Sequence, residues 1–230
     1  TTLVLRLRSL SNESADLQRL HIARQLITLL ASDARVQPAL QTLNEGGAST
    51  SVGDVLRFLR ALGPGIVPHI LAGLGVLESP VHRRILCDLI VEFGIPNVAE
   101  LEKHIEDQRW FVVRDVLMLA QRHPPSAIAH VVGHVLEHPH PKVRECAVGM
   151  LRTFEAGAAD RFLALRLRDV DSDVRLVAIR TAAIRKSADA VPVMVELLTD
   201  DTIHDRSPRE LRMLTAAYAV IAGRDAIPLL

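Results

Sequence analysis

Histidine residues are concentrated in one short stretch of the chain. Five of the ten histidines fall between His123 and His140. Helical spacing puts His130, His134 and Glu137 at positions i, i+4 and i+7, so the three side chains share one face about one turn apart. Imidazole and carboxylate groups are suitable ligands for zinc or iron. The alternative is an exposed polar surface that contacts a protein; we favour it and predict no metal or other cofactor.

The helix that carries these histidines must pack through its other face. That face is apolar over residues 126–138, and the spacing predicts burial of Ile128, Val131, Val132, Val135 and Leu136. One helix cannot bury such a stripe alone, so the sequence predicts partner helices on this side.

Two later segments, 140–168 and 171–199, repeat one pattern. Each begins with a polar turn and a Val-Arg pair, continues with an apolar helix, breaks briefly, and ends with a second apolar helix. An arginine in the first turn recurs at intervals of 30, 30 and 31 residues: Arg84, Arg114, Arg144 and Arg175. A fixed period of this length predicts stacked helical hairpins, because each hairpin buries its apolar faces only against its neighbours.

Proline and glycine mark the expected ends of these helices. Proline at a helix start costs no hydrogen bond, and six prolines fit such positions: Pro64, Pro80, Pro96, Pro125, Pro141 and Pro208. Glycine is favoured just after a helix, which predicts helix ends at Gly63, Gly94 and Gly223.

The sequence resembles the HEAT-repeat family, especially its short bacterial form, also called phycobilisome-lyase-like repeats. The resemblance rests on Asp171-x-Asp173-Val174-Arg175-x-x-Ala178, Ala190-Val191-Pro192-x-x-x-x-Leu197 and His140-Pro141-x-Val143-Arg144-x-x-Ala147. It is good over residues 80–200 and looser over 12–79. It implies an all-α fold, a right-handed α-α superhelix of the HEAT/armadillo solenoid type with about six to seven helical hairpins.

The resemblance places the whole chain, residues 1–230, in a single repeat array. The expected repeats span about residues 12–45, 51–77, 80–107, 109–138, 140–168, 171–199 and 206–230. The last repeat is shorter than the others, and no capping repeat with a polar outer face follows it. We therefore expect the chain to be a segment of a longer array.

In such repeats the second helices line the concave surface, which implies one candidate binding patch. By the 30-residue period, His104 aligns with His134, while Glu100 and Asp160 align with His130. The predicted partner-binding residues, on the concave or edge surface, are Glu100, His104, His130, His134, Glu137, Asp160, Arg161 and Arg168.

The recurring arginines are expected to link successive layers. In HEAT-like repeats this arginine typically pairs with an aspartate of a neighbouring turn, and four are available here: Asp169, Asp171, Asp173 and Asp200. Between the layers, the helical phase predicts a buried set: Leu86, Ile90, Val113, Leu117, Val143, Ala147, Leu151, Val174, Ala178 and Ala182.

Bulk composition restricts the classes of function. The 27 basic and 27 acidic residues cancel, so the chain has no general attraction for polyanions. Apolar residues make up 49% and aromatic residues only 3%, which favours closely packed helices over sheets. Cys87 and Cys146 lie in apolar helix patterns and are predicted to be buried free thiols. No apolar run approaches the ~18 residues of a membrane span, and we expect a cytoplasmic protein.

An uneven distribution of charge offers a second reading, nucleic-acid binding. Residues 142–186 contain ten bases and six acids. Five of these side chains could face a phosphate backbone, as in HEAT-like DNA glycosylases: Arg161, Arg168, Arg180, Arg185 and Lys186. The aromatic residues that usually accompany such a surface are missing, since Trp110 and Tyr218 are the only Trp and Tyr. A solvated face with local ion pairs is the preferred explanation.

Enzymatic readings rest on analogy with the family. Deoxyhypusine hydroxylase, a HEAT-like enzyme, holds two irons with adjacent His-Glu pairs, and this sequence has no His-Glu dipeptide. A chromophore-lyase activity rests on the family resemblance alone, and no residue is assigned to it. Phosphate-binding glycine loops, nucleophile elbows and Cys-x-x-Cys pairs are also missing. We therefore predict a non-catalytic scaffold that binds a protein partner or a neighbouring domain.

Overall fold

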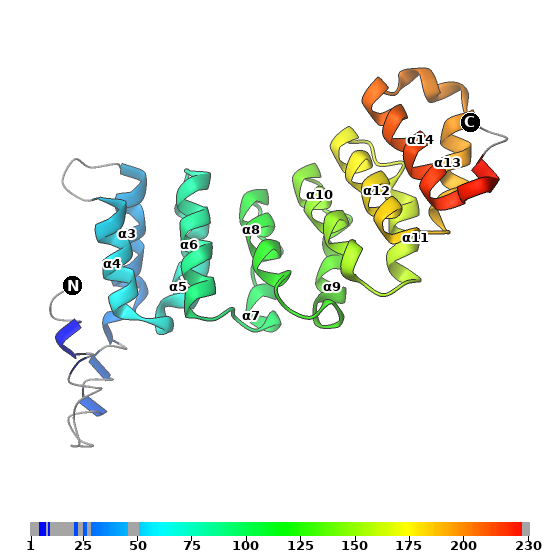
Figure 1. The fold of residues 1–230 in the computed structure, drawn as a ribbon. Helices are drawn as coiled ribbons and strands as arrows, with labels where there is room; N and C mark the ends of the chain where they lie inside the picture. The colour runs from blue at the N-terminus through cyan, green and yellow to red at the C-terminus, as the bar shows by residue number, and fades with distance from the viewer. Residues whose placement is uncertain are drawn as a thin grey trace. The chain divides into compact units, whose positions relative to one another are not determined.

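The computed structural model describes residues 5–7, 9, 21–22, 25–26, 29–45 and 51–226, and these residues form helices and connecting turns with no β-strand (Figure 1). Part of the first expected repeat, residues 12–45, and the end of the last one, residues 206–230, lie outside the described residues. The described α-helices are α3 (Asp33–Glu45), α4 (Val52–Leu62), α5 (Val67–Gly73), α6 (Pro80–Phe93), α7 (Val98–Glu102), α8 (Trp110–Ala120), α9 (Pro125–Val135), α10 (Pro141–Met150), α11 (Ala158–Arg166), α12 (Ser172–Arg185), α13 (Ala190–Thr199) and α14 (Pro208–Ala222).

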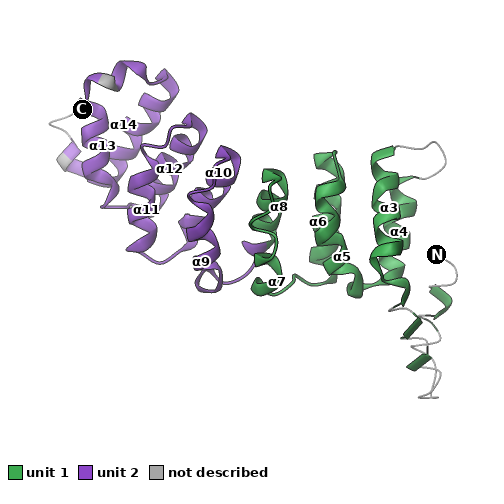
Figure 2. Ribbon diagram, turned by 180° about the vertical axis from the view of Figure 1, so that it is seen from behind, with its two compact units in different colours: residues 1–119 green, residues 120–230 purple. Residues whose placement is uncertain are grey.

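Short 3-10 helices join several of these helices. They are η1 (Pro64–Ile66), η2 (Leu74–Val76), η3 (Leu151–Thr153), η4 (Asp201–Asp205) and η5 (Gly223–Ala226). The chain divides into two compact units, residues 1–119 and 120–230 (Figure 2). A single array over residues 1–230 stays a prediction, and each unit is described by itself.

Within each unit the helices pack as stacked hairpins, the architecture of an α-solenoid. In the first unit α3 contacts α4 and α5, and α5 contacts α6. In the second unit the first helices of successive hairpins pack in the order α10, α12, α14. The second helices α11 and α13 contact each other, and each also packs on the first helix that follows it. The predicted all-α solenoid fold is confirmed.

Proline and glycine occupy the helix ends as predicted. Pro80, Pro125, Pro141 and Pro208 are the first residues of their helices, and Pro64 is the first residue of η1. The expected start at Pro96 is displaced, because Asn97 caps α7 with its side chain and the helix begins at Val98. The three predicted terminal glycines all have positive φ, a conformation that costs glycine little: Gly63, Gly94 and Gly223.

The predicted interlayer core is confirmed at every position. All ten residues named from the helical phase are buried: Leu86, Ile90, Val113, Leu117, Val143, Ala147, Leu151, Val174, Ala178 and Ala182. Cys87 is buried as expected, whereas Cys146 is only half-buried. Burial of apolar area at each of these sites is the main favourable contribution to stacking the hairpins.

Arginines link the hairpins with one repeated geometry. Arg144 donates from Nη1 to the carbonyl oxygens of His138 and Pro139, at 2.9 and 3.0 Å. Its Nε and Nη2 donate to the two carboxylate oxygens of Asp169, at 2.9 and 2.7 Å. The guanidinium thus holds the turn before its own helix and the turn before α12, which confirms the predicted pairing with Asp169.

Arg175 repeats this geometry one hairpin later. Its Nη1 donates to the carbonyl oxygens of Asp169 and Val170, at 2.9 and 3.2 Å. Its Nε and Nη2 donate to Glu210 of α14, at 2.7 and 2.8 Å. Glu210 is not one of the four aspartates that were predicted as partners. The acceptor here comes from α14, the first helix of the next hairpin.

In the first unit the linking residue is Arg83, and the prediction of Arg84 for this role was wrong. Arg83 donates from Nη1 to Leu77 and Glu78 carbonyls at 2.7 and 3.0 Å, and from Nε to Asp115 at 3.0 Å. Its side chain is 7% exposed. Arg84 is 75% exposed and lies 3.6 Å from Asp88. The two arginines are adjacent, so a displacement of one residue rotates the side chain by about 100° around the helix.

Among the described residues, no single helix is both long and apolar enough to cross a membrane. The helical segments 52–62 and 64–76 reach the length and apolar composition of a membrane span only when they are counted together. The chain bends by 105° between them.

Candidate functional site

Most of the predicted partner-binding residues of the second unit are exposed. His130, His134 and Glu137 lie on the outer face of α9 and the turn after it, and Arg161 and Arg168 lie on α11 and the turn after it. On the opposite face of α9 the predicted apolar stripe is buried, including Val131 and Val135. The predicted phase of this helix is therefore confirmed.

Two of the predicted residues, Glu100 and His104, belong to the first unit. Both are half-buried, Glu100 within α7 and His104 in the turn that follows it. Lys103 lies 2.5 Å from the Glu100 carboxylate. In the repeat predicted over residues 80–107 the second helix, α7, ends at Glu102, and the chain then passes through turns before Trp110.

Several predicted residues are already engaged within the second unit. The carboxylate of Glu137 pairs with Arg166, and Arg168 pairs with Glu196. Asp160 accepts hydrogen bonds from Arg185 and from the backbone N–H of Gly157. The hydrogen bond from Arg185 holds the pKa of the Asp160 carboxyl below its usual range. Asp160 therefore joins α11 to α12 and is not free to bind a partner through this carboxylate.

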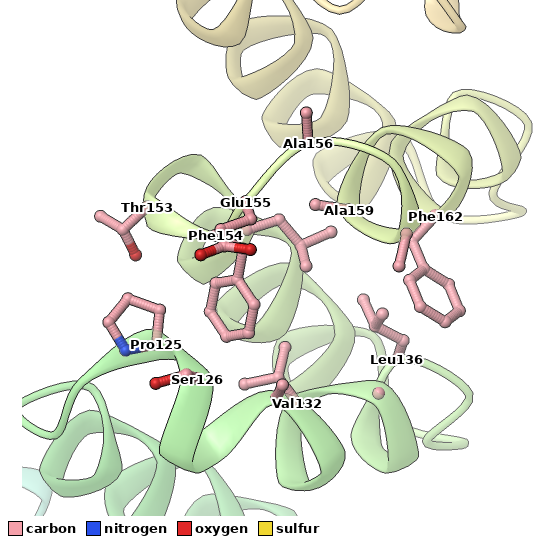
Figure 3. Close-up of a pocket in the computed structure, with 14 residues that line it drawn as sticks. Pro125, Ser126, Val132, Leu136, Thr153, Phe154, Glu155, Ala156, Ala159 and Phe162 are labelled. Atoms are coloured by element: carbon pink, nitrogen blue, oxygen red, sulfur yellow. The ribbon is translucent and has the colours of Figure 1, made fainter.

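An apolar groove of about 460 Å³ lies between α9 and the segment that runs from η3 into α11 (Figure 3). Buried side chains form its floor: Val132, Leu136, Leu151 and Ala159. Small residues widen it, notably Ala129, Gly133, Ala156 and Ala158. The remaining lining residues are Pro125, Ser126, Thr153, Phe154, Glu155 and Phe162. Two of the five phenylalanines of the chain therefore lie at this one groove.

Arg185 holds the connecting segment that forms one wall of the groove. From α12 its Nη1 donates to the carbonyl oxygens of Leu151 and Phe154, at 2.8 and 2.6 Å. Its Nη2 donates to the carbonyl of Glu155 at 3.3 Å, and its Nε to Asp160 at 3.0 Å. In Figure 3 the ring of Phe154 projects from this segment toward α9. Arg185 thus fixes the backbone that presents Phe154 to the groove.

In the alternative of nucleic-acid binding Arg185 would face a phosphate backbone, but its guanidinium is bonded to Asp160 and to backbone carbonyls of the connecting segment. Other bases of residues 142–186 are also held within the chain, including Lys142, which lies 2.9 Å from both Glu145 and Asp173. Four bases of this region are exposed and have no carboxylate partner among the described residues: Arg152, Arg161, Arg180 and Lys186.

Charged side chains lie beside the groove on both of its walls. Arg161 follows the lining residue Ala158 by one turn of α11, and His130 follows the lining residue Ser126 by one turn of α9. Arg152 lies between two lining residues of η3 and is exposed. The exposed acid among the lining residues is Glu155.

Metal and thiol chemistry find little support in the described residues. Among them, no three His, Cys, Asp or Glu side chains converge as metal ligands. Burial raises the pKa of the Cys87 thiol to about 12, so this sulfur stays protonated at neutral pH and is a poor nucleophile. His130 and His134 form an exposed polar row on α9.

The groove itself had not been predicted, although the sequence contains a signal for it. Phenylalanine is rare in this chain, yet Phe154 and Phe162 both line the groove, and alanine or glycine occupies several of the other lining positions: Ala129, Gly133, Ala156 and Ala158. Small side chains opposite rings leave space that larger ones would fill. His130, one helical turn after the lining residue Ser126, lies beside this groove.

Comparison with protein families supports the fold. Residues 131–215 match the family model of HEAT repeats, which spans α10 to α13 and parts of α9 and α14. A search of curated proteins found no match. The matched segment includes Arg144, Arg175 and all the groove-lining residues from Val132 to Phe162. Residues 131–215 are therefore similar to HEAT repeats, in agreement with the stacked hairpins of the described residues.

Proposed function

We propose that the chain is a non-catalytic scaffold that binds a protein partner, or a neighbouring domain, through the groove surface formed by α9, residues 151–157 and α11. HEAT repeats are generally protein-interaction scaffolds. The observation that carries the proposal is the groove itself, an open and mainly apolar surface that no described part of the chain covers.

The composition of the surface supports a protein partner. Protein interfaces typically have an apolar centre and a polar rim. Here the apolar floor is bordered by His130 on one wall and Arg161 on the other. Leu165, which lies one turn after Arg161 on α11, is 60% exposed and extends the apolar surface beyond the groove.

Site-specific photo-cross-linking tests the proposal. A photoreactive amino acid is placed singly at His130 and at Arg161 in the full chain, expressed in its source cells, and adducts are identified by mass spectrometry. Both positions should capture the same protein, which is then purified and titrated against the chain. Ala127, exposed on another face of α9, is the control position. Adducts no more frequent at the two rim positions than at Ala127 would rule out this surface.

Nucleic-acid binding is a second candidate function, favoured by the four exposed bases without a carboxylate partner: Arg152, Arg161, Arg180 and Lys186. Each phosphate contact releases counterions, so affinity for duplex DNA should fall steeply as salt rises. Titration of labelled duplex DNA at two salt concentrations checks this. Lack of binding at low salt excludes the second candidate.

A further inference from the structure

The groove matches the dimensions of a short helix. Its lining positions run along α9 from Pro125 to Leu136, the residue just after the helix, which is about three helical turns at 1.5 Å per residue. A helix laid in a groove presents apolar side chains at i, i+3 or i+4, and i+7, which also spans about two to three turns. The two surfaces therefore have compatible lengths and side-chain spacings.

Backbone hydrogen bonding favours a helix over an extended peptide. An extended peptide needs partners for its N–H and C=O groups, which sheet-edge recognition supplies. The described residues contain no strand edge, and the groove is lined mainly by side chains of two helices. One of its hydroxyls, Thr153 Oγ1, is already bound to the Met150 carbonyl at 3.1 Å. A helix forms its backbone hydrogen bonds internally, so it needs only apolar contacts from the groove.

The charges beside the groove favour an acidic partner. Arg152 and Arg161 are exposed cations, and neither has a carboxylate partner among the described residues. Two neighbouring acids are neutralised within the chain, Glu137 by Arg166 and Asp160 by Arg185. Glu155 remains as the exposed acid of the lining.

Resting on the proposed function, we propose that the groove binds an amphipathic α-helix of another polypeptide. Its apolar stripe lies against Val132, Leu136, Phe154 and Phe162, and its flanking Asp and Glu side chains face Arg152 and Arg161. The specificity is for this pattern of apolar and acidic residues and requires no cofactor.

A helical peptide library displayed on phage and selected against the full chain provides the probe. Selected peptides should carry apolar residues at i, i+3 or i+4, and i+7, with more Asp and Glu than Lys and Arg on the flanks. A selected peptide is then synthesised, and its affinity is measured by fluorescence anisotropy against wild type and variants.

Gly133→Trp is the informative variant. A Cβ placed on Gly133 meets no atom within 4 Å, so a side chain can start there without a clash and extend into the groove that this residue lines. Binding of the selected peptide should weaken at least tenfold. Ala127→Trp, on another face of the same helix, is the matched control and should leave the affinity unchanged. Circular dichroism of both variants verifies that the fold is retained.

Charge is tested with Arg161→Glu. This variant should bind the acidic peptide about fivefold more weakly, the size expected for one exposed charge pair. It should strengthen binding of a version in which the flanking acids are replaced by lysines. Equal effects on both peptides would overturn the electrostatic part of the proposal.

The remaining outcomes overturn the helix proposal in distinct ways. Enrichment of basic or extended peptides, no enrichment, or full affinity for Gly133→Trp would each do so. Anilinonaphthalene sulfonate binding that Gly133→Trp abolishes, without helix enrichment, identifies a site for small apolar molecules. A dimer in light scattering that Gly133→Trp dissociates identifies a second copy of the chain. If a cross-linked partner still binds Gly133→Trp at full affinity, the scaffold function stands and the helix proposal fails; if no partner is captured, the scaffold function fails.

Discussion

Arg144 and Asp169 form a buried bidentate pair, in which the guanidinium donates to both carboxylate oxygens at 2.9 and 2.7 Å. Only 1% of the Asp169 side chain is exposed. Burial raises the pKa of this carboxyl, and hydrogen bonds from Arg144, the Asp171 N–H and Arg166 outweigh it, so the pKa lies below its usual range. The pair joins the turn before α10 to the turn before α12.

Arg144→Met should destabilise the chain by about 3–5 kcal/mol, because it leaves a buried carboxylate without its main partner. Urea denaturation of the full chain measures the loss, with exposed Arg180→Met as a control that should change stability by less than about 0.5 kcal/mol.

The pH dependence of this variant has a definite sign. In the wild type the lowered pKa of Asp169 contributes stability above the unfolded value of 3.8, and this contribution is lost as pH falls through the folded value. In Arg144→Met the burial of Asp169 dominates, and protonation relieves it. The stability difference between the two proteins should therefore narrow as pH falls toward 4. A difference that widens would contradict this account of the pair.

Leu117→Ala and Leu151→Ala should each cost about 2–5 kcal/mol, as truncation of buried leucines does elsewhere. Both side chains are almost fully buried, Leu117 in the first unit and Leu151 in the second. Leu165→Ala, at a 60% exposed site, is the control. Because repeats contact only their neighbours, hydrogen exchange should increase mainly within the unit that carries the substitution. Uniform exchange throughout the chain would show that the two units unfold together.

Two histidines before α10 should make stability fall at mildly acidic pH. His140 Nδ1 accepts the Lys142 N–H at 3.2 Å, and His138 Nδ1 accepts the His140 N–H at 3.0 Å. Burial, mainly, lowers the pKa of both rings from 6.5, with further lowering of the His140 pKa by Arg144 and Lys142. A lowered histidine pKa contributes stability above the unfolded value, and that stability is lost as pH falls through the folded value.

The melting temperature should accordingly decrease between pH 7.5 and about 5, where the unfolded histidines bind more protons. His140→Asn keeps a side-chain acceptor at this helix N-cap but does not titrate. The variant should therefore show a smaller decrease than wild type over the same interval. Identical decreases in the two proteins would mean that the cap does not contribute to the pH dependence.

The fold was predictable from the sequence because burial follows the helical period so regularly. Val143, Ala147 and Leu151 recur every four residues and all face the core. Assigning the linking arginine was less certain, since Arg83 and Arg84 are adjacent and both fit an interval near 30 residues. The buried residue proved to be Arg83, whose side chain reaches the two carbonyls of the preceding turn and Asp115.

The groove could not be derived from spacing alone, because it depends on contacts between distant residues. Arg185 is 30 or more positions away from the carbonyls of Leu151, Phe154 and Glu155 that it holds. A sequence pattern marks Arg185 as one more base at the end of a helix. Only its direction in the fold shows that it positions the segment carrying Phe154.

Two helical glycines should respond to alanine with opposite signs. Alanine is favoured over glycine within a helix by about 1 kcal/mol, because it loses less backbone freedom on folding. At Gly133 an added Cβ meets no atom within 4 Å, so Gly133→Ala should stabilise the chain by about this amount. At Gly73 the Cβ falls 2.2 Å from Leu40 Cδ1 and 3.2 Å from the Gln37 amide. Leu40 is fully buried and has little room to move, so Gly73→Ala should cost about 1–3 kcal/mol through overpacking. Urea denaturation of the two variants side by side measures both effects, and changes of the same sign would show that the space around one of these glycines differs from that described.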